Sequence, residues 1–461
     1  MDKEYDLIVI GSGGGTKLVT PVADLGLKVA IIEKGPLGGT CLNRGCIPSK
    51  MLLQTSHLLS TLKEAKRFEI EIKGSIHVHY EKLIKRVYET IQKESQSIHP
   101  LYENHPYIDF WKGEAFFTQK MTLECNGHRL KGKKVIIGVG GRAFIPEIPG
   151  LDQVPYITYE EALYLPKKPK KLLVIGGGYI AAELGYFYAS LGVETEFFVR
   201  SVMLRPEDDD IQEAFQSAFS KLATLHLGCT IQKVSWHQGT FRLEALSDQG
   251  TRFISEGDAL LVATGIKPWT DSLKLENTAI EVDQKGFVKV NDSLETTQKH
   301  VYALGDCVGN FLFRHSANFE GQYLFRKLFQ NSQGPIHYPA VPHAVFSFPE
   351  VAGVGLTERE LQKRKIPYLI GKNSYEASAR GMAILPEVGF VKLLFHKASL
   401  KLLGAHIIGS EASNMIHMLI LALQMEATLK DLLEMIYIHP ALPEIVRNAA
   451  RNAARTAKIP F

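Results

Sequence analysis

Two copies of a strand–glycine–helix pattern constrain the fold of this 461-residue chain more than any other feature. In the first copy, the apolar run Asp6–Ile10 predicts a buried strand, and the sequence GSGGGT follows it directly. Gly11 and Gly13 stand in the first two places of the dinucleotide-binding GxGxxG pattern. Gly11 would make the tight turn, and Gly13 would let the backbone approach a pyrophosphate at the helix N-terminus.

The first copy has two departures and one supporting feature. Thr16 stands where the third glycine belongs, which predicts looser packing of the helix on the strand. Pro21 lies inside the expected helix and predicts a kink. The next strand, Lys28–Ile32, ends at Glu33, about 20 residues after Gly11, where a carboxylate can bind a ribose hydroxyl. A plain turn with a surface glutamate is the weaker interpretation.

The second copy is KLLVIGGGYIAAE, at residues 171–183. Its strand is Leu172–Ile175, and Gly176, Gly178 and Ala181 match the permitted GxGxxA form. Two such units are far more specific than one, and they predict two dinucleotides with electrons passing between two carriers.

The second copy ends in cations rather than in a carboxylate. Its next strand, Glu194–Val199, is followed by Arg200 and Arg205. Because arginine is a bidentate partner for phosphate, these residues favour NADPH, with its 2′-phosphate, over NADH. Solvated surface arginines are the alternative.

Three further strands end in glycine-containing turns: Val135–Gly141, Leu260–Gly265 and Val301–Asp306. The first two predict chain crossings that close a nucleotide domain, and the third places Asp306 at the carboxyl end of a strand, where ligands gather in open parallel sheets. A linker between the two domains is indicated by Pro146, Pro149, Pro155, Pro166 and Pro169. From about Tyr338, alternating apolar residues predict antiparallel strands, followed by helices over Ala412–Met425 and Thr428–Met435.

The composition is that of an ordinary globular protein of about three domains, with 45% hydrophobic and 22% charged residues. The net charge is only +4, and the basic cluster Lys167–Lys171 is interrupted by Pro169, which favours a surface linker over a nucleic-acid site. The start of the chain does not resemble a secretory signal, and no apolar run reaches the length of a membrane span. We therefore expect a cytoplasmic protein that binds neither nucleic acid nor a membrane.

Cys41 and Cys46 are the candidate reactive pair among five cysteines, because the other three are scattered. A redox-active disulfide is favoured over zinc, which would need a second close pair of ligands. Residues five apart on a straight helix lie roughly 9 Å apart, whereas a disulfide needs about 4.4–6.8 Å between Cα atoms. The segment CLNRGC is therefore predicted to be a bent loop, made flexible by Gly45, that enters a helix whose first turn contains Pro48. The N-terminus of that helix would favour a nucleophilic thiolate.

His439 is the candidate acid–base residue, with Glu444 five residues further on. A histidine held near neutrality by a carboxylate can move protons during thiol–disulfide exchange. The alternative is an ordinary surface histidine, and the sequence pattern alone favours the functional role only weakly.

Together these motifs resemble the FAD-dependent pyridine nucleotide–disulfide oxidoreductases. The resemblance rests on GGTCLNRGCIPSK at 38–50, both glycine patterns, ATG at 263–265, LGD at 304–306 and HPALPE at 439–444, and it covers essentially the whole chain. It implies an α/β fold with two Rossmann-like dinucleotide-binding domains and a C-terminal α+β dimerisation domain. The expected divisions are 1–150 and 271–337 for FAD, 151–270 for NAD(P), and 338–461 for the dimer interface.

The resemblance also implies site residues. Those expected at FAD are Gly11, Gly13, Glu33, Gly39, Thr40, Lys50, Ala115, Asp306 and His315. Those expected at NAD(P) are Gly176, Gly178, Ile180, Glu183, Arg200, Arg205 and Gly265, with Glu183 pairing Lys50 beside the flavin. No metal site is expected.

In the implied mechanism Cys41 is the interchange thiol that attacks substrate, and Cys46 is the charge-transfer thiol against the flavin. His439, oriented by Glu444 and followed by a cis bond to Pro440, would act on the other subunit of a homodimer. The catalytic set is therefore Cys41, Cys46, His439 and Glu444.

The active-site motifs are most similar to those of dihydrolipoamide dehydrogenases, whose substrate is a small dithiol or a lipoyl group on a carrier domain. The arginines instead resemble NADPH-dependent reductases of low-molecular-weight disulfides such as glutathione or mycothione. A mercuric reductase is less expected, because those enzymes carry a further C-terminal cysteine pair and this sequence ends in RTAKIPF. A non-enzymatic flavin redox sensor is the alternative from another functional class.

Overall fold

The computed structural model describes residues 2–460, which form two compact units. The first unit contains the chain up to Ser49 together with Glu81–Ile145 and Gly265–His337. The second contains Lys50–Tyr80, Pro146–Thr264 and the chain from Tyr338 onward. The finer division at residues 150, 270 and 337 stays a prediction.

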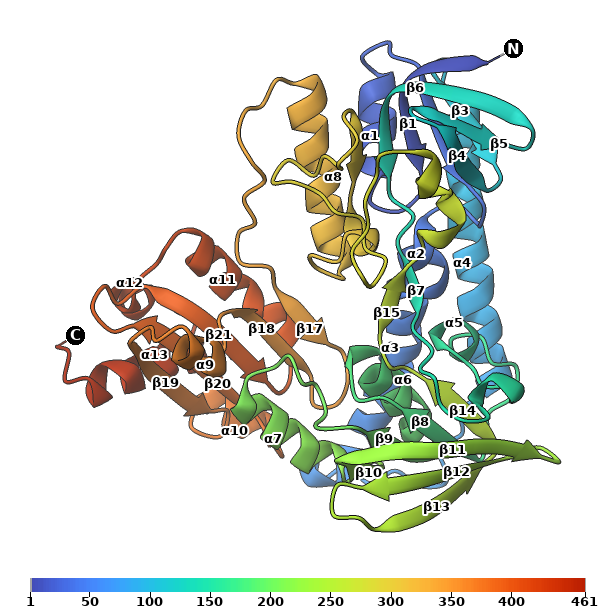
Figure 1. Cartoon of the computed structure of the whole chain (residues 1–461). Coiled ribbons are helices and arrows are strands. Elements are labelled where there is room, and N and C mark those ends of the chain that lie inside the picture. Colours follow the sequence, from blue (N-terminus) through green and yellow to red (C-terminus); the bar gives the residue numbers. More distant parts are fainter. Residues whose placement is uncertain (1, 461) are drawn as a thin grey trace. The chain divides into compact units, whose positions relative to one another are not determined.

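A seven-stranded sheet forms the first unit (Figure 1). The strand order is β3-β2-β1-β6-β5-β4, with β16 also paired to β6. The pairs that join β3, β2, β1, β6 and β16 are parallel, and those that join β6, β5 and β4 are antiparallel. The bounds are β1 (Lys3–Ile10), β2 (Val29–Glu33), β3 (Ile108–Lys112), β4 (Ala115–Gln119), β5 (Thr122–Cys125), β6 (His128–Ile137) and β16 (Val301–Ala303).

Helices cover the parallel part of this sheet because its strands are apolar on both faces. Leu7–Ile10 and the apolar part of β2 are almost completely buried, as their unbroken hydrophobic runs predicted. The helices are α1 (Thr16–Ala23), α2 (Gly39–Arg44), α4 (Tyr80–Glu103) and α8 (Arg314–Phe329), with short turns η3 (Asp271–Leu273), η4 (Leu275–Asn277) and η5 (Gly305–Cys307). A two-stranded ribbon joins β7 (Gly141–Ala143) to β15 (Ile266–Pro268).

The second glycine pattern lies in a four-stranded parallel sheet of order β10-β9-β8-β14. Its strands are β8 (Lys171–Ile175), β9 (Glu194–Val199), β10 (Thr224–Leu227) and β14 (Ala259–Val262), with η2 (Leu151–Gln153), α5 (Tyr159–Ala162), α6 (Tyr179–Ser190) and α7 (Asp209–Phe219). An antiparallel sheet of β11 (Cys229–His237), β12 (Thr240–Ser247) and β13 (Arg252–Gly257) follows β10 along the chain, and the sequence analysis did not predict it.

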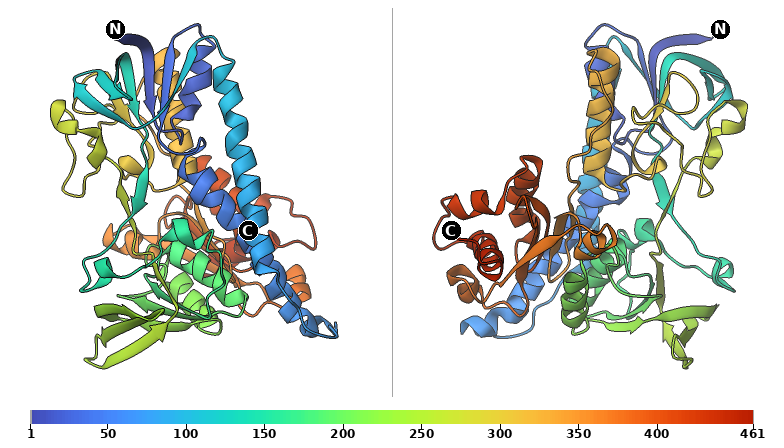
Figure 2. Two further views of the ribbon diagram at one scale, coloured as in Figure 1. Left: turned by 90° about the vertical axis from the view of Figure 1, so that its right-hand side faces the viewer. Right: turned by 60° about the vertical axis from the view of Figure 1, so that its left-hand side comes forward.

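The C-terminal region is a five-stranded antiparallel sheet of order β17-β18-β21-β20-β19. This confirms the change of pattern predicted from Tyr338. The strands are β17 (His343–Val345), β18 (Val351–Gly355), β19 (Tyr368–Ser374), β20 (Phe390–His396) and β21 (Leu402–Ile408). The helices are α9 (Glu358–Lys363), α10 (Ala379–Ile384), α11 (Ala412–Gln424), α12 (Leu429–Glu434) and α13 (Glu444–Thr456). Side chains of α11, α12 and α13 share one apolar core with alternate residues of the central strands, and Figure 2 shows these red helices along the orange strands.

One residue of those strands, Lys392, belongs to a buried ionic cluster. Lys392 of β20 is 1% exposed, and its Nζ lies 2.8 Å from Asp208 Oδ1 and 2.6 Å from Glu358 Oε2. Asp208 is fully buried and caps α7. Burial opposes ionisation of Asp208, but the bonds from Lys392 and from the Glu358 backbone hold its pKa below the usual value. The cluster thereby fixes the segment just before α7, which contains Arg205.

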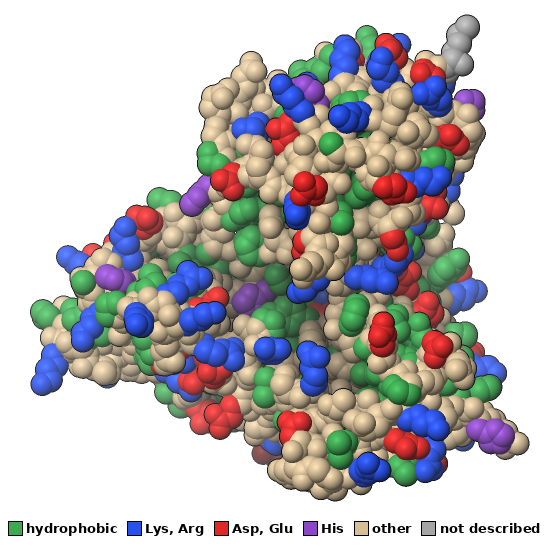
Figure 3. Space-filling view, in the orientation of Figure 1, with side chains coloured by type: hydrophobic (Ala, Val, Ile, Leu, Met, Phe, Trp, Pro, Cys, Tyr) green, Lys and Arg blue, Asp and Glu red, His purple; other side chains and the backbone are tan. Residues whose placement is uncertain are grey.

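Acidic and basic side chains are interspersed on the face seen in Figure 3, in keeping with a net charge of +4. Among residues 2–460, no helix combines the length and the hydropathy needed to cross a membrane. Within the same residues, no three His, Cys, Asp or Glu side chains form a group suited to a metal ion.

Candidate active site

The first glycine loop begins at the end of β1. Gly11 has φ +96°, and a Cβ at that position would lie 2.4 Å from the carbonyl oxygen of Gly138 at the end of β6. A Cβ on Gly39, φ +67°, would lie 2.9 Å from the Cα of Gly13. Only glycine fits these two positions, so three chain segments meet with bare backbone around Gly13.

Glu33 is bonded to this loop through Ser12, a residue that the sequence analysis missed. Oε2 of Glu33 accepts bonds from the backbone N of Ser12 at 2.9 Å and from its Oγ at 2.8 Å. Ser12 Oγ in turn accepts from the backbone N of Gly38 at 3.0 Å and of Gly39 at 3.1 Å. A hydroxyl between the two pattern glycines is the sequence signal that could have indicated this link.

The looser helix–strand packing expected at Thr16 stays a prediction. The close approach is made one residue earlier, at Gly15, where a Cβ would lie 2.7 Å from Val9 Cγ1. The hydroxyl of Thr16 instead donates to the carbonyl of Gly13 at 2.8 Å and supports the first turn of α1. Pro21 lies within α1.

The candidate cysteines lie on two consecutive helices rather than on the predicted bent loop. Cys41 belongs to α2, the chain breaks its helical path at Gly45 (φ −148°, ψ −112°), and Cys46 is the first residue of α3 (Cys46–Glu64). A Cβ on Gly45 would lie 3.4 Å from the Cα of Cys41 and 3.0 Å from the carbonyl oxygen of Thr40, so the break folds the chain back on α2. The bend at Gly45 and the placement of Pro48 in the first turn of α3 are as predicted.

The three other cysteines differ from this pair in exposure. Cys41 and Cys46 are half-buried, whereas Cys125, Cys229 and Cys307 are buried. Burial raises the pKa of all three, that of Cys307 to about 12, which makes them poor nucleophiles.

Lys50, one helical turn after Cys46, forms an ion pair with Glu183 of α6. Its Nζ lies 2.9 and 2.7 Å from the two carboxylate oxygens, and 4.6 Å from the centre of the Phe346 ring. The backbone N of Phe346 also donates to Glu183, at 3.1 Å. The contact agrees with the pairing expected from the resemblance, and its place beside a flavin stays a prediction.

The second glycine loop repeats the geometry of the first. Gly176 has φ +129°, and a Cβ there would lie 2.2 Å from the carbonyl oxygen of Ala263, just after β14. Gly178 is the N-cap of α6 and Ile180 lies half-buried in its first turn. Gly265, φ +135°, has open space where a Cβ would lie.

Arg200 and Arg205 follow β9, and both side chains are exposed. The backbone carbonyl of Arg205 accepts hydrogen bonds from Gln212 Nε2 at 3.1 Å and from Arg359 Nη2 at 3.2 Å. The neighbouring Glu207 is fully buried and receives bonds from Tyr179 and from His343 at 2.9 Å. Sequence reasoning missed Glu207 and His343, which are far apart along the chain.

Asp306 lies in η5 after β16, as the LGD motif predicted. Desolvation raises its pKa to about 6, although the nearby Arg314 acts in the opposite direction. His315, in the first turn of α8, is exposed and stacks on Phe313 at 5.1 Å between ring centres. Ala115 is buried in the core beside Ile32 and Cys307.

His439 precedes a cis bond to Pro440, as expected. Its Nδ1 lies 3.1 Å from both carboxylate oxygens of Glu444, at the start of α13, while 71% of its side chain is exposed. Glu444 also accepts from Arg447 at 2.8 Å and from the backbone of Ala441 at 3.2 Å. Burial opposes its ionisation, but these bonds keep the pKa of Glu444 below its usual value, so a carboxylate fixes the ring.

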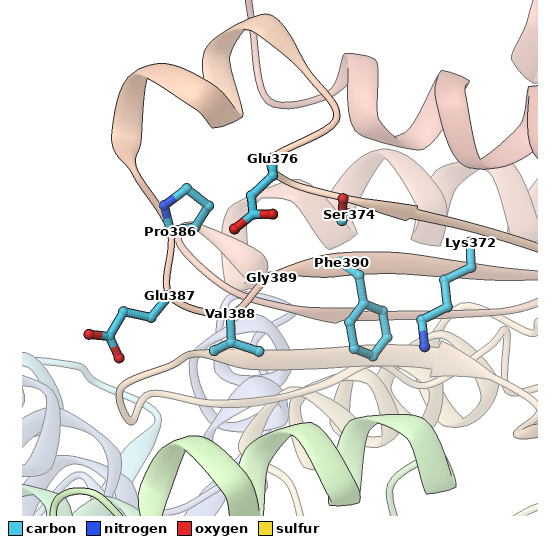
Figure 4. Close-up of a pocket in the computed structure, with 8 residues that line it drawn as sticks. All are labelled: Lys372, Ser374, Glu376, Pro386, Glu387, Val388, Gly389 and Phe390. Carbon is cyan, nitrogen blue, oxygen red and sulfur yellow. The ribbon is translucent and has the colours of Figure 1, made fainter.

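A separate hollow of about 350 Å³ lies beside β19 and β20 (Figure 4). It contains none of the predicted site residues. Its lysine, Lys372, is paired with Asp210 and lies 4.1 Å from the centre of the Phe390 ring, and Ser374, Glu376 and Glu387 also line the hollow. Most of the predicted residues instead lie in four places: the loop around Gly13, the cysteines of α2 and α3, the loop around Gly178 with the Lys50–Glu183 pair of the same unit, and the His439–Glu444 pair.

Two family models match the chain. Residues 5–321 match the pyridine nucleotide-disulphide oxidoreductase model, and residues 341–450 match the dimerisation domain of the same family. A dihydrolipoyl dehydrogenase of Chlorobaculum tepidum is 32% identical over 98% of both chains. A mercuric reductase of Bacillus cereus is 33% identical over 94% of this chain and 68% of its own length.

Among solved structures, the HOCl-induced flavoprotein disulfide reductase RclA of Escherichia coli, in a Cu(II) complex, has the same fold. The TM-score is 0.87 over 98% of this chain and 99% of that one, at 24% identity. Both the α/β architecture and the motifs thus agree with the matched models. The chain belongs to the pyridine nucleotide-disulphide oxidoreductase family, whose members use FAD and NAD(P)H.

Proposed function

We propose that this protein is a flavoprotein disulfide oxidoreductase of the dihydrolipoamide dehydrogenase-like group. It would pass electrons between NAD(P)(H) and a dithiol or disulfide substrate through Cys41 and Cys46. The observation that carries the proposal is the break at Gly45, which folds the start of α3 back onto the helix that contains Cys41. The half-buried state of both cysteines, unlike that of the other three, supports a reactive pair.

FAD fits the glycine loop of the first unit. Gly11 and Gly39 let three chain segments meet closely around Gly13, whose backbone would hold the diphosphate; Glu33 would accept from ribose hydroxyls, and Asp306 would lie toward the ribityl chain. When bound, the flavin supplies a carrier that accepts two electrons from the nicotinamide and passes them to a disulfide.

The protein's own residues then divide the thiol chemistry. Cys41 would attack the substrate, and Cys46, at the positive end of α3, would be favoured as a thiolate. Lys50, neutralised by Glu183 at 2.7 Å, would contribute a positioned ammonium rather than a mobile charge. His439 would hold and deliver the proton at its exposed Nε2, because Glu444 occupies Nδ1.

His439 is proposed to serve the site of a second subunit. The dimerisation domain contains it, its side chain is 71% exposed, and the neighbouring Ile436 and Ile438 are 96% and 81% exposed. A mixture of Cys41→Ser and His439→Gln chains tests this. Each variant alone should be inactive. After dimers re-form at random from an equimolar mixture, each mixed dimer should have one intact site, so about a quarter of all sites should be active. No recovery would place both residues in one chain's site.

A second candidate, an NADPH-dependent reductase of a low-molecular-weight disulfide, is favoured by the exposed Arg200 and Arg205. The discriminating experiment compares flavin reduction by NADPH and NADH, followed by turnover with lipoamide, glutathione disulfide and mercuric ion. Turnover with dihydrolipoamide or lipoamide supports the first candidate. Preference for NADPH with turnover of a small disulfide supports the second, and absence of any turnover would support a redox sensor instead.

A further inference from the structure

The first turn of α8 lies directly on the glycine loop of the first unit. A Cβ on Gly14 would be 2.9 Å from the Cβ of Ala317, and a Cβ on Gly321 would be 2.6 Å from the carbonyl oxygen of Gly14. Two glycines on facing elements therefore let the loop and α8 come into backbone contact. One turn before Ala317, the helix begins at Arg314.

Arg314 points toward the place that the loop leaves bare. Its Nη1 lies 3.5 Å from the position that a Cβ on Gly13 would take. The guanidinium also lies close enough to Asp306 to oppose the rise in that carboxyl's pKa. Arg314 is thus adjacent both to the middle of the glycine loop and to the carboxylate expected near the ribityl chain.

Three carboxylates lie near this loop. Glu33 is bonded to Ser12, Asp306 lies in η5, and Glu320, 1% exposed, accepts from the backbone N of Gly305 at 2.6 Å. A diphosphate placed over Gly13 would add two negative charges to this set. The N-termini of α1 and α8 offset part of that charge, and a guanidinium provides the charge-assisted hydrogen bonds that phosphate oxygens accept best.

We propose that Arg314 binds the diphosphate of FAD and is a determinant of cofactor retention. This goes beyond the residues expected from the resemblance, which include its neighbour His315 but not Arg314, and it rests on the family's use of FAD. A purely structural alternative is that Arg314 only balances Asp306. That alternative predicts no dependence on whether the ligand carries phosphate.

The test uses the full-length chain stripped of flavin, with ADP and adenosine as the two probes. Arg314→Gln should weaken ADP binding by about 10-fold to 100-fold, the range for loss of a bond to a charged group. Adenosine binding should change less than about two-fold, because its contacts are retained. Arg314→Lys keeps the positive charge but loses the forked guanidinium, so its ADP affinity should lie between those of the parent and Arg314→Gln.

Arg326→Gln is the matched control, because it removes the same charge from the exposed last turn of α8. In the holoenzyme, Arg314→Gln should release FAD faster, and release should depend less on salt than in the parent and in the control. Equal weakening of ADP and adenosine, or no weakening of either, would overturn the proposal. If Arg314→Gln does not fold, the ratio of ADP to adenosine affinity in Arg314→Lys decides: an unchanged ratio overturns the proposal and a lowered one supports it.

Discussion

The two glycine loops have nearly the same backbone geometry, but the side chains that follow their second strands have opposite charges. Gly11 and Gly176 both have positive φ, and a Cβ on either would be within 2.4 Å of a carbonyl at the end of the crossing strand, from Gly138 or Ala263. After the second strand the first loop meets Glu33, and the second meets Arg200. In the proposed function the shared backbone would hold a diphosphate in each loop, and the charge after the second strand would select the nucleotide.

The two loops also differ in the residue that lies between their first two pattern glycines. Ser12 in the first loop links Glu33 to Gly38 and Gly39 by hydrogen bonds. Its counterpart Gly177 has no side chain; a Cβ there would be 2.6 Å from Val199, and its carbonyl accepts from Leu204 at 2.7 Å. The first loop thus holds its carboxylate inward, and the second packs tightly while its arginines point outward.

The largest expected effect comes from exchanging the paired glycines for alanine. Gly11→Ala should give protein without flavin, whereas Gly176→Ala should keep flavin but slow its reduction by NAD(P)H at least about 100-fold, because strain and clash add. Flavin content and stopped-flow reduction measure the two losses. Gly26→Ala and Gly192→Ala are matched controls, since both positions have positive φ but open space. Flavin loss in both test variants would mean that the loops do not serve separate nucleotides.

The next largest effect is on the pH dependence of folding stability. It comes from Asp306, which follows β16 in the first unit. The unfolded chain loses the Asp306 proton near pH 3.8 and the folded chain near pH 6, so this group's contribution falls as pH rises between those values. The total loss should be roughly 2–3 kcal/mol in the flavin-free protein. Asp306→Asn should remove this fall in the free energy of unfolding with pH. Denaturant unfolding of both proteins from pH 4 to 7 measures it. Parallel profiles for the two proteins would contradict it.

A smaller effect, on the use of NADPH, is expected from replacing the exposed Arg200 or Arg205. Arg200→Gln or Arg205→Gln should each lower kcat/KM for NADPH about 10-fold and leave that for NADH within about two-fold. Arg252→Gln, an exposed arginine on β13, is the control. Steady-state rates with both coenzymes make the comparison, and an equal loss with NADH would show that the arginines do not read a 2′-phosphate.

The smallest effect is expected from Ser12→Ala. It removes one bond to Glu33 and two acceptor contacts, but the backbone N of Ser12 still donates to Glu33 at 2.9 Å. FAD affinity should fall about five-fold, with no change in reduction by NADPH of the enzyme that retains flavin. Unchanged affinity in a fluorescence titration would mean that the backbone bond alone positions the carboxylate.

Local pattern was enough to predict the elements around each loop. The predicted strand Glu194–Val199 is β9 without change, because its apolar run is bounded by Gly192 and by Arg200. The His439–Glu444 contact was also accessible, since the two residues are five apart. Cys41 was placed in a loop because six helical residues ended by a glycine give too little periodic signal.

What the sequence could not reveal depends on residues brought together from a distance. Arg314 reaches Gly13 across some three hundred residues only because Gly14 and Gly321 allow contact. His343 meets Glu207, and Lys392 meets Asp208, through the stacking of the C-terminal sheet on the start of α7. None of these four residues lies in a recognisable sequence motif, so a single sequence contains no signal that pairs them.

The hydrogen bonds that hold the Arg205 backbone have a consequence for substitutions of its side chain. Its carbonyl is bound by Gln212 and Arg359, and the next residues are tied to a buried lysine, yet its side chain points into solvent. Replacing that side chain leaves every one of those bonds in place. Substitutions of the exposed Arg205 side chain should therefore cost little folding stability, which makes this position well suited to testing the proposed coenzyme preference.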